Sequence, residues 1–208
     1  MKPPIHFLVL IATFALMGCS AMPHHRSKIF DPMTAVVRID SKKDGQPSVE
    51  GRGFLVSPDG IIATSAKLVA DGQTLRITLT DGRALPGTFL EQDKQSGVAL
   101  VQVHGTELPT LALFDGDLLP DMHVRALGSA GVTHGRFDHW ENFGRDIDFT
   151  ASVGPKDCGA PLLADDGRAV GVVLGPVEGQ PGEFDAAPIW QVLRLMPQLV
   201  HHANPYAQ

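Results

Sequence analysis

The chain has 208 residues, of which 43% are hydrophobic and 19% are charged, so it can bury a substantial core and lacks the composition of a disordered protein. Its formal net charge is -6 and it has no long run of Lys and Arg, which argues against nucleic acid as a partner because phosphate binding needs clustered positive charge. The 22 glycines and 16 prolines predict many turns and favour an all-β chain over a helical bundle.

The first nineteen residues have the pattern of a secretory signal. Lys2 precedes an apolar run over residues 7–16, which is short for a membrane-spanning helix of about 20 residues, and Gly18-Cys19 follows it. This pattern resembles a bacterial lipoprotein signal. The resemblance implies a signal peptide over residues 1–18, acylation of Cys19 and contact with the membrane through the lipid. Ser20 after it resembles the pattern that favours the outer membrane; an uncleaved anchor and an ordinary signal peptide are the alternatives.

The remaining residues before the domain, 19–33, lack periodicity and are interpreted as a lipid-anchored tether. Cys19 and Cys158 are the two cysteines of the chain. If Cys19 is acylated, Cys158 is left without a partner thiol, so no internal disulfide is expected even in an oxidising compartment.

Turn signals are dense beyond residue 33, where six Asp-Gly dipeptides occur between apolar or alternating runs. Residues 54–56 and 61–63 flank one such turn at 59–60, and residues 75–80 alternate between apolar and polar side chains before the turn at 81–82. These patterns predict hairpins. Further strands are predicted over residues 98–103, 123–127, 161–164 and 169–174.

A break near residues 114–120 divides the strands into two groups, and the final segment changes to a helical period. One helical face is expected to carry Ile189, Val192, Leu193, Met196, Leu199 and Val200, with Pro197 ending or kinking the helix. The pattern predicts two small antiparallel barrels, at about 34–114 and 118–188, then a helix at about 188–200 and a tail at 201–208.

Three segments resemble the active-site motifs of chymotrypsin-like serine proteases of the HtrA/DegP branch. They cover residues 63–69, 93–100 and 157–162, in the order of that family. Residues 51–64 and 184–189 are similar to its opening hairpin and to the strand before its last helix. The resemblance runs from about residue 34 to 200 and implies a trypsin-like double β-barrel with a C-terminal helix and no PDZ domain.

In this resemblance Lys67 stands at the position of the catalytic histidine, Gly97 at that of the aspartate and Cys158 at that of the serine. A lysine with an ordinary pKa near about 10.4 is protonated at neutral pH and cannot take a proton, while glycine has no side chain to orient a base. Lys156 replaces a glycine that supplies one oxyanion N–H, the other coming from Cys158. We therefore expect no catalytic residues, and a pseudoprotease that binds a protein or peptide on the periplasmic side of the envelope.

Two alternatives remain open. A thiolate is a good nucleophile and a nearby ammonium lowers the pKa of a thiol, so Cys158 with Lys67 is a candidate pair for a cysteine-dependent hydrolase. Against this pair, the adjacent Asp157 is expected to raise the pKa of the thiol and to repel an oxyanion. The other alternative is a structural or regulatory subunit of an envelope complex.

Imidazole and carboxylate groups, which can bind zinc, lie close in sequence at His134, Asp138, His139 and Glu141. Their spacing matches no closed metal motif, and the resemblance assigns this stretch to a surface loop and strand, where polar residues are ordinary. The sequence therefore predicts no metal site, and it contains no motif for a cofactor.

Overall fold

The computed structural model describes residues 30–70, 72–141, 144, 146–177 and 181–202. The predicted signal peptide, Cys19 and most of the predicted tether lie outside these residues. Among the described residues, no helix has the length and apolar content needed to cross a membrane. The chain from Asp31 onward forms one compact unit.

Barrel one contains the first six strands, which follow a short 3-10 turn, η1 (Pro32–Ala35). The strands are β1 (Val36–Lys42), β2 (Val49–Leu55), β3 (Ile61–Ser65), β4 (Thr74–Thr78), β5 (Ala84–Asp93) and β6 (Val98–Gln102). They are hydrogen-bonded in the order β1-β2-β3-β6-β5-β4, and β4 pairs back with β1 to close the barrel. The predicted hairpins at 59–60 and 81–82 are confirmed as the β2–β3 and β4–β5 connections.

Barrel two contains the other six strands, with a second 3-10 turn, η2 (Pro155–Asp157), before its fourth strand. The strands are β7 (His123–Gly128), β8 (Gly131–Glu141), β9 (Asp146–Phe149), β10 (Pro161–Ala164), β11 (Ala169–Pro176) and β12 (Phe184–Pro188). Their order is β10-β11-β12-β9-β8-β7, and β7 pairs with β10. The sequence patterns did not single out β1, β5, β8 and β9. Exposed residues interrupt the apolar pattern of β5 and β8, and two of the four residues of β9 are aspartates.

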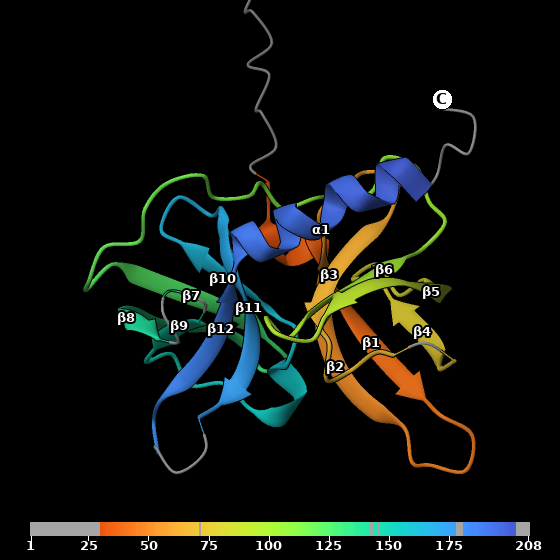
Figure 1. Ribbon diagram of the computed structural model, residues 1–208, viewed down its shortest axis with the longest axis horizontal. Coiled ribbons are helices and arrows are strands. Elements are labelled where there is room, and N and C mark those ends of the chain that lie inside the picture. The colour runs from red at the N-terminus through yellow and green to blue at the C-terminus, as the bar shows by residue number, and fades with distance from the viewer. Residues whose placement is uncertain (1–29, 71, 142–143, 145, 178–180, 203–208) are drawn as a thin grey trace, which may run out of the picture. The chain divides into compact units, whose positions relative to one another are not determined.

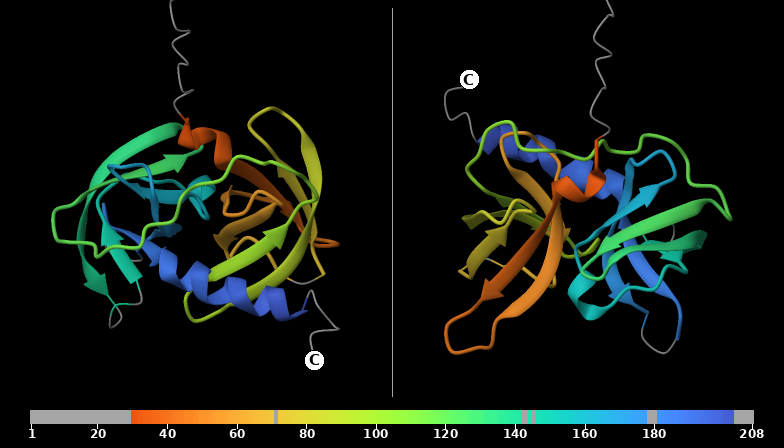
Figure 2. Two further views of the ribbon diagram at one scale, coloured as in Figure 1. Left: turned by 90° about the horizontal axis from the view of Figure 1, so that it is seen from above. Right: turned by 180° about the vertical axis from the view of Figure 1, so that it is seen from behind.

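Each barrel has an apolar interior, and a third buried cluster lies between the barrels. We call this third set the inter-barrel cluster. It includes Phe54, Val98 and Leu100 from barrel one and Leu127, Leu163 and Val172 from barrel two. Figures 1 and 2 show the barrels side by side, so this apolar contact fixes the position of one barrel relative to the other.

The C-terminal helix α1 (Ile189–His202) follows β12 directly and lies across one end of both barrels (Figure 1). Ile189, Val192 and Leu195 pack into the inter-barrel cluster. Arg194 forms an ion pair with Asp93 at the end of β5, so the helix also contacts barrel one through charge. The predicted double barrel with a C-terminal helix is confirmed.

One residue of the predicted helical face is wrong. Leu193 is 42% exposed, whereas Leu195, which was not assigned to the buried face, is 5% exposed. The helix continues past Pro197 to His202, so Pro197 does not end it, and a kink at Pro197 stays a prediction. Pro197 has no backbone N–H, so it cannot donate the helical hydrogen bond to the carbonyl of Leu193.

The contrast between two neighbouring leucines of α1 gives a test of how the helix is held. We expect Leu195→Ala to lower the free energy of unfolding by about 2–5 kcal/mol, because it leaves a cavity in the inter-barrel cluster. Leu193→Ala should change it by roughly 0.5 kcal/mol or less, because that side chain is already largely hydrated. Urea unfolding of both variants measures the difference, and equal effects would contradict the assigned face.

Candidate functional site

The three positions that correspond to a catalytic triad are contributed by both barrels. Lys67 lies just after β3, Gly97 lies in the turn between β5 and β6, and Cys158 follows η2 in barrel two. The backbone N–H of Ala66 donates to the carbonyl of Gly97 at 2.7 Å, which joins the first two segments. The N–H of Arg52 in β2 donates to the carbonyl of Cys158 at 2.9 Å, which ties the third segment to barrel one.

Leu174 of β11 lies at the centre of this arrangement. Its carbonyl oxygen accepts a hydrogen bond from the Nζ of Lys67 at 3.1 Å and another from the Sγ of Cys158 at 3.4 Å. Its side chain lies next to the space that a Cβ of Gly97 would occupy. The structure therefore brings all three positions together around one residue, which sequence analysis did not identify because Leu174 is an ordinary apolar strand residue.

The Cys158 side chain is buried, with 7% of the residue exposed. Burial raises the pKa of the Cys158 thiol above its ordinary value, because a thiolate is poorly solvated there. A hydrogen bond with Ser65 and the positive charge of Lys67 act in the opposite direction but do not outweigh burial. The thiol is therefore protonated at neutral pH and acts as the donor to Leu174.

Gly97 has a backbone conformation that disfavours any side chain. Its φ is +71°, in the left-handed region, and a Cβ at this position would lie 3.1 Å from the Cδ2 of Leu174. A carboxylate at position 97 would therefore require both backbone strain and displacement of Leu174. The arrangement contains no acid that orients Lys67 from this position.

Asp157 holds the loop before Cys158. Its carboxylate accepts backbone hydrogen bonds from Ser129 at 2.5 Å and from Gly154 at 2.7 Å. Burial alone would raise the pKa of Asp157, but these N–H donors outweigh it and the pKa lies below its ordinary value. The expectation that Asp157 raises the pKa of the thiol is corrected: burial raises it, and the carboxylate is engaged with the loop backbone.

The residues beside Cys158 are also fixed by contacts with barrel one. Lys156 is an exposed side chain whose Nζ pairs with Glu50 of β2 at 3.3 Å. Gly159 has a φ of +86°, and a Cβ there would lie 2.1 Å from the carbonyl oxygen of Arg52, so only glycine fits. Its N–H donates to the carbonyl of Val173 at 2.7 Å. The loop is thus clamped between the two barrels.

A second group of polar side chains lies on the outer face of barrel two. We call it the acidic face, and it consists of Asp138, Glu141, Asp148 and Asp185 with His139 among them. Of the four residues considered from sequence, the structure brings three together, and His134 lies apart on β8 in a shallow pocket with His123 and Asp165. Asp148 and Asp185 were not identified from the sequence. Each stands beside apolar residues in a strand, and this pattern is typical of an ordinary solvent-facing position.

Two carboxyl groups of the acidic face have raised pKa values. Burial raises the pKa of Asp148, and the charge of Glu183 adds to this effect. Burial and the charges of Asp146 and other acids raise the pKa of Asp185 to about 6. The charge of Lys67 acts on Asp185 in the opposite direction, so the acidic face borders the site around Leu174.

Comparison with known proteins supports the identification of the fold. The family model described as the trypsin-like peptidase domain matches residues 51–172. The chain belongs to the trypsin-like peptidase family. A DegP-like periplasmic serine endoprotease of Chlamydia pneumoniae is 31% identical over 175 residues, which cover 76% of this chain and 36% of that protein. A DegP-like relative from Halomonas elongata is 33% identical over 134 residues, covering 59% of this chain and 28% of that protein.

A solved structure gives the same architecture. The serine endoprotease from Yersinia pestis superposes with a TM-score of 0.72 at 19% sequence identity, covering 81% of this chain and 64% of that chain. The chain spans about a third of the length of the curated relatives it matches. The trypsin-like peptidase domain is therefore shared with DegP-like relatives, whereas the activity of this chain has to be argued from its own residues.

The raised pKa of Cys158 makes its reactivity testable. In a Cys19→Ser variant, where Cys158 is the remaining thiol, we expect the rate of alkylation by iodoacetamide to rise with pH and to reach its midpoint above pH 9.0, the ordinary value. Adding Lys67→Ala should move the midpoint to still higher pH, because the ammonium favours the thiolate. A midpoint near neutral pH would contradict this interpretation and indicate an activated nucleophile.

Proposed function

We propose that this trypsin-like peptidase domain lacks peptidase activity and binds an extended segment of another protein beside Cys158. The observation that carries the proposal is the pair of bonds to Leu174, in which the Lys67 ammonium and the Cys158 thiol both donate to one carbonyl. Acyl transfer needs a general base that takes the proton of the nucleophile. Here burial favours the protonated thiol, both side chains donate to the same carbonyl, and position 97 offers no carboxylate.

A trypsin-like domain without a functional triad is expected to have very little peptidase activity. Removal of triad members lowers turnover by roughly four to six decades in serine proteases, because the residues act as a unit. Positions 67, 97 and 158 are all changed here. Binding of a peptide through backbone groups does not need the side chains at these three positions. The fold can therefore still bind a peptide after these changes.

The end of β11 supports peptide binding. Pro161 of β10 pairs with Val172, and Ala160 accepts the N–H of Val173, which ends the contact between these two strands. β11 then continues to Pro176 with β12 on its other side. Within the described residues no strand pairs with this last part of β11 along its other edge. An extended peptide can add to such an edge through its own backbone groups.

A binding experiment distinguishes this proposal from the cysteine-dependent hydrolase. With fluorescein-labelled β-casein as an unfolded probe, we expect a rise in anisotropy at micromolar concentrations and an intact probe on a gel after hours of incubation. Cys158→Ala should leave both results unchanged, because the thiol is not used. Cleavage that Cys158→Ala abolishes would overturn the proposal in favour of the hydrolase, and absence of binding would overturn the binding function.

Photo-crosslinking locates the bound segment in the same experiment. A photoreactive residue at Pro176, which is exposed at the end of β11, should crosslink to the probe. The matched control is the exposed Thr80, at the β4–β5 turn of barrel one, where no crosslink is expected. Equal crosslinking at the two positions would count against the β11 edge.

The same proposal includes a place in the cell envelope, with Cys19 acylated. Its support is the signal pattern of residues 1–19 and the periplasmic naming of the DegP-like relatives. With the lipid attached, the domain would face the periplasm from the membrane surface. Ser20 supports the outer membrane as its destination.

The two cysteines provide a matched test of this anchoring. In cells fed labelled palmitate, we expect the wild-type chain and Cys158→Ser to carry the label and to sediment with membranes. Cys19→Ser should lose the label because the acceptor thiol is gone. Labelling of Cys19→Ser, or no labelling of the wild-type chain, would contradict the proposed anchor.

A further inference from the structure

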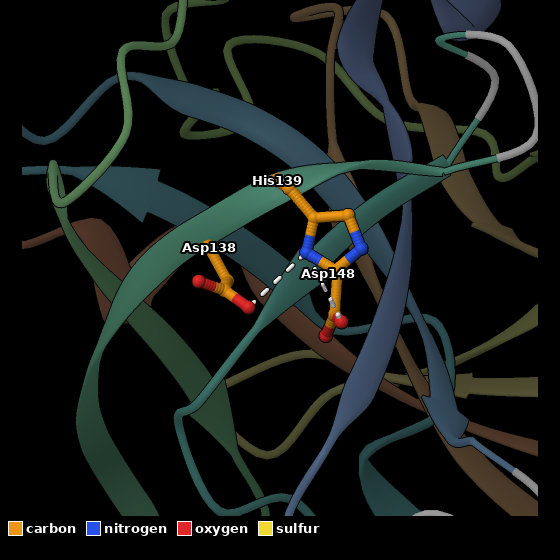
Figure 3. A group of neighbouring side chains, drawn as sticks. All are labelled: Asp138, His139 and Asp148. Carbon is orange, nitrogen blue, oxygen red and sulfur yellow. Dashed lines mark hydrogen bonds and ion pairs between the residues drawn. The ribbon is translucent and has the colours of Figure 1, made fainter.

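A bulge in β8 brings two adjacent side chains toward one residue of β9. Phe137 pairs with Phe149 and Trp140 pairs with Ile147, so Asp138 and His139 both lie opposite the residue between them. That residue is Asp148. In a regular strand adjacent side chains point to opposite faces, and a bulge removes this alternation locally. Figure 3 shows the result, with dashed lines that join one ring nitrogen of His139 to an oxygen of Asp138 and to an oxygen of Asp148.

The three side chains have the separation of ligands around one metal ion. The Nδ1 of His139 lies 3.1 Å from an oxygen of Asp138 and 3.7 Å from an oxygen of Asp148. One such atom from each residue lies within 4.8 Å of the others. A tetrahedral ion with ligand bonds of about 2.1 Å separates its ligands by about 3.4 Å, so little movement is needed to enclose one.

Asp148 gives an independent reason to expect a cation. Its side chain is 2% exposed, and neither carboxylate oxygen accepts a hydrogen bond from any described residue. Burying a carboxylate without hydrogen bonds is costly, and natural proteins compensate such groups with a positive charge or a metal. Asp185, which pairs with Asp148 across β12 and β9, also has a buried oxygen without a hydrogen bond among the described residues. The site therefore has a deficit of positive charge.

The second ring nitrogen of His139 completes the pattern. The Nε2 atom faces Glu141, with 3.4 Å to the nearest carboxylate oxygen. In metal sites the ring nitrogen that does not bind the ion is commonly oriented by a carboxylate, which fixes the ring and makes the other nitrogen a better ligand. Glu141 is positioned for this role, leaving Nδ1 directed toward the two aspartates.

We propose that Asp138, His139 and Asp148 bind a divalent transition-metal ion, with Zn²⁺ as the ion that fits best. A set of one imidazole nitrogen and two carboxylates suits zinc, whereas Ca²⁺ and Mg²⁺ prefer sites made of oxygen ligands. Water would complete the coordination. The ion joins β8 to β9 on the outer face of barrel two and neutralises the acidic face. Sequence spacing missed the site because Asp148 comes from another strand.

Thermal unfolding and calorimetric titration of the full chain, without an added affinity tag, test this site. After treatment with EDTA, Zn²⁺ at a hundredfold excess over its Kd should raise Tm by roughly 5–10 °C. Ca²⁺ at the same concentration should produce little shift. No shift with Zn²⁺ would overturn the proposal, and a larger shift with Ca²⁺ would overturn the assignment to a transition metal.

Matched variants separate this site from other histidines of the chain. Asp148→Asn and His139→Ala should lose the zinc-dependent shift, whereas His134→Ala on the same strand should keep it. Asp148→Asn removes the buried charge, so we expect it to fold and to unfold without metal at the same or a higher temperature than the wild-type chain.

A further control replaces His24, His25, His201 and His202 together with alanine, because paired histidines near the ends can also bind Zn²⁺. This variant should keep the shift. Binding with unchanged affinity in Asp148→Asn and His139→Ala, or its loss in the four-histidine variant, would show that the ion binds elsewhere.

Discussion

The apolar contact between the two barrels positions every residue of the candidate site. Lys67 and Gly97 belong to barrel one, while Cys158 and Leu174 belong to barrel two, so their geometry exists only while the inter-barrel cluster holds the barrels together. The helix α1 packs into the same cluster and reaches Asp93 of barrel one. Burial of apolar surface is roughly proportional to area and has no direction, so directional contacts fix the final register. These are the bonds from Arg52 to Cys158 and from Lys156 to Glu50.

Burial between the barrels determines whether the Cys158 thiol is protonated. Lys67 and Ser65 both favour a thiolate at Cys158, yet desolvation has the larger effect and the thiol keeps its proton. The carbonyl of Leu174 accepts one hydrogen bond from the Lys67 side chain and one from the thiol. The result is a stable polar contact in the place where a protease would need a proton acceptor. Because Lys67 belongs to barrel one and Leu174 to barrel two, the bond between them also joins the two barrels.

Much of the fold could be predicted from sequence because turns and alternation are local signals. The Asp-Gly dipeptides indicate hairpin turns. The alternation of Leu75, Ile77 and Leu79 with polar residues indicates a strand with one buried face. Positions 67, 97 and 158 could also be recognised, because each lies within one short segment that resembles a family motif. The helix was predicted with Leu193 on its buried face, an error that arose because a helical period alone does not define which neighbouring side chain meets the core.

The remaining features depend on contacts between distant segments, which a single sequence does not encode locally. Leu174 looks like any apolar strand residue, and its importance comes from its main-chain carbonyl. Asp148 reaches His139 because of a bulge, and a bulge changes register by one residue without a distinctive sequence. Asp157 was assigned an electrostatic effect on its neighbour, whereas its carboxylate turns toward Ser129 and Gly154.

The left-handed backbone of Gly97 limits which residues its turn can accept. Because an L-residue is disfavoured at this φ and Leu174 occupies the adjacent space, a change of side chain at position 97 also disturbs the main chain. Introducing histidine, aspartate and serine at positions 67, 97 and 158 would leave the aspartate on a turn whose backbone favours glycine. Engineering a triad onto this chain would therefore require rebuilding the β5–β6 turn as well as exchanging three side chains.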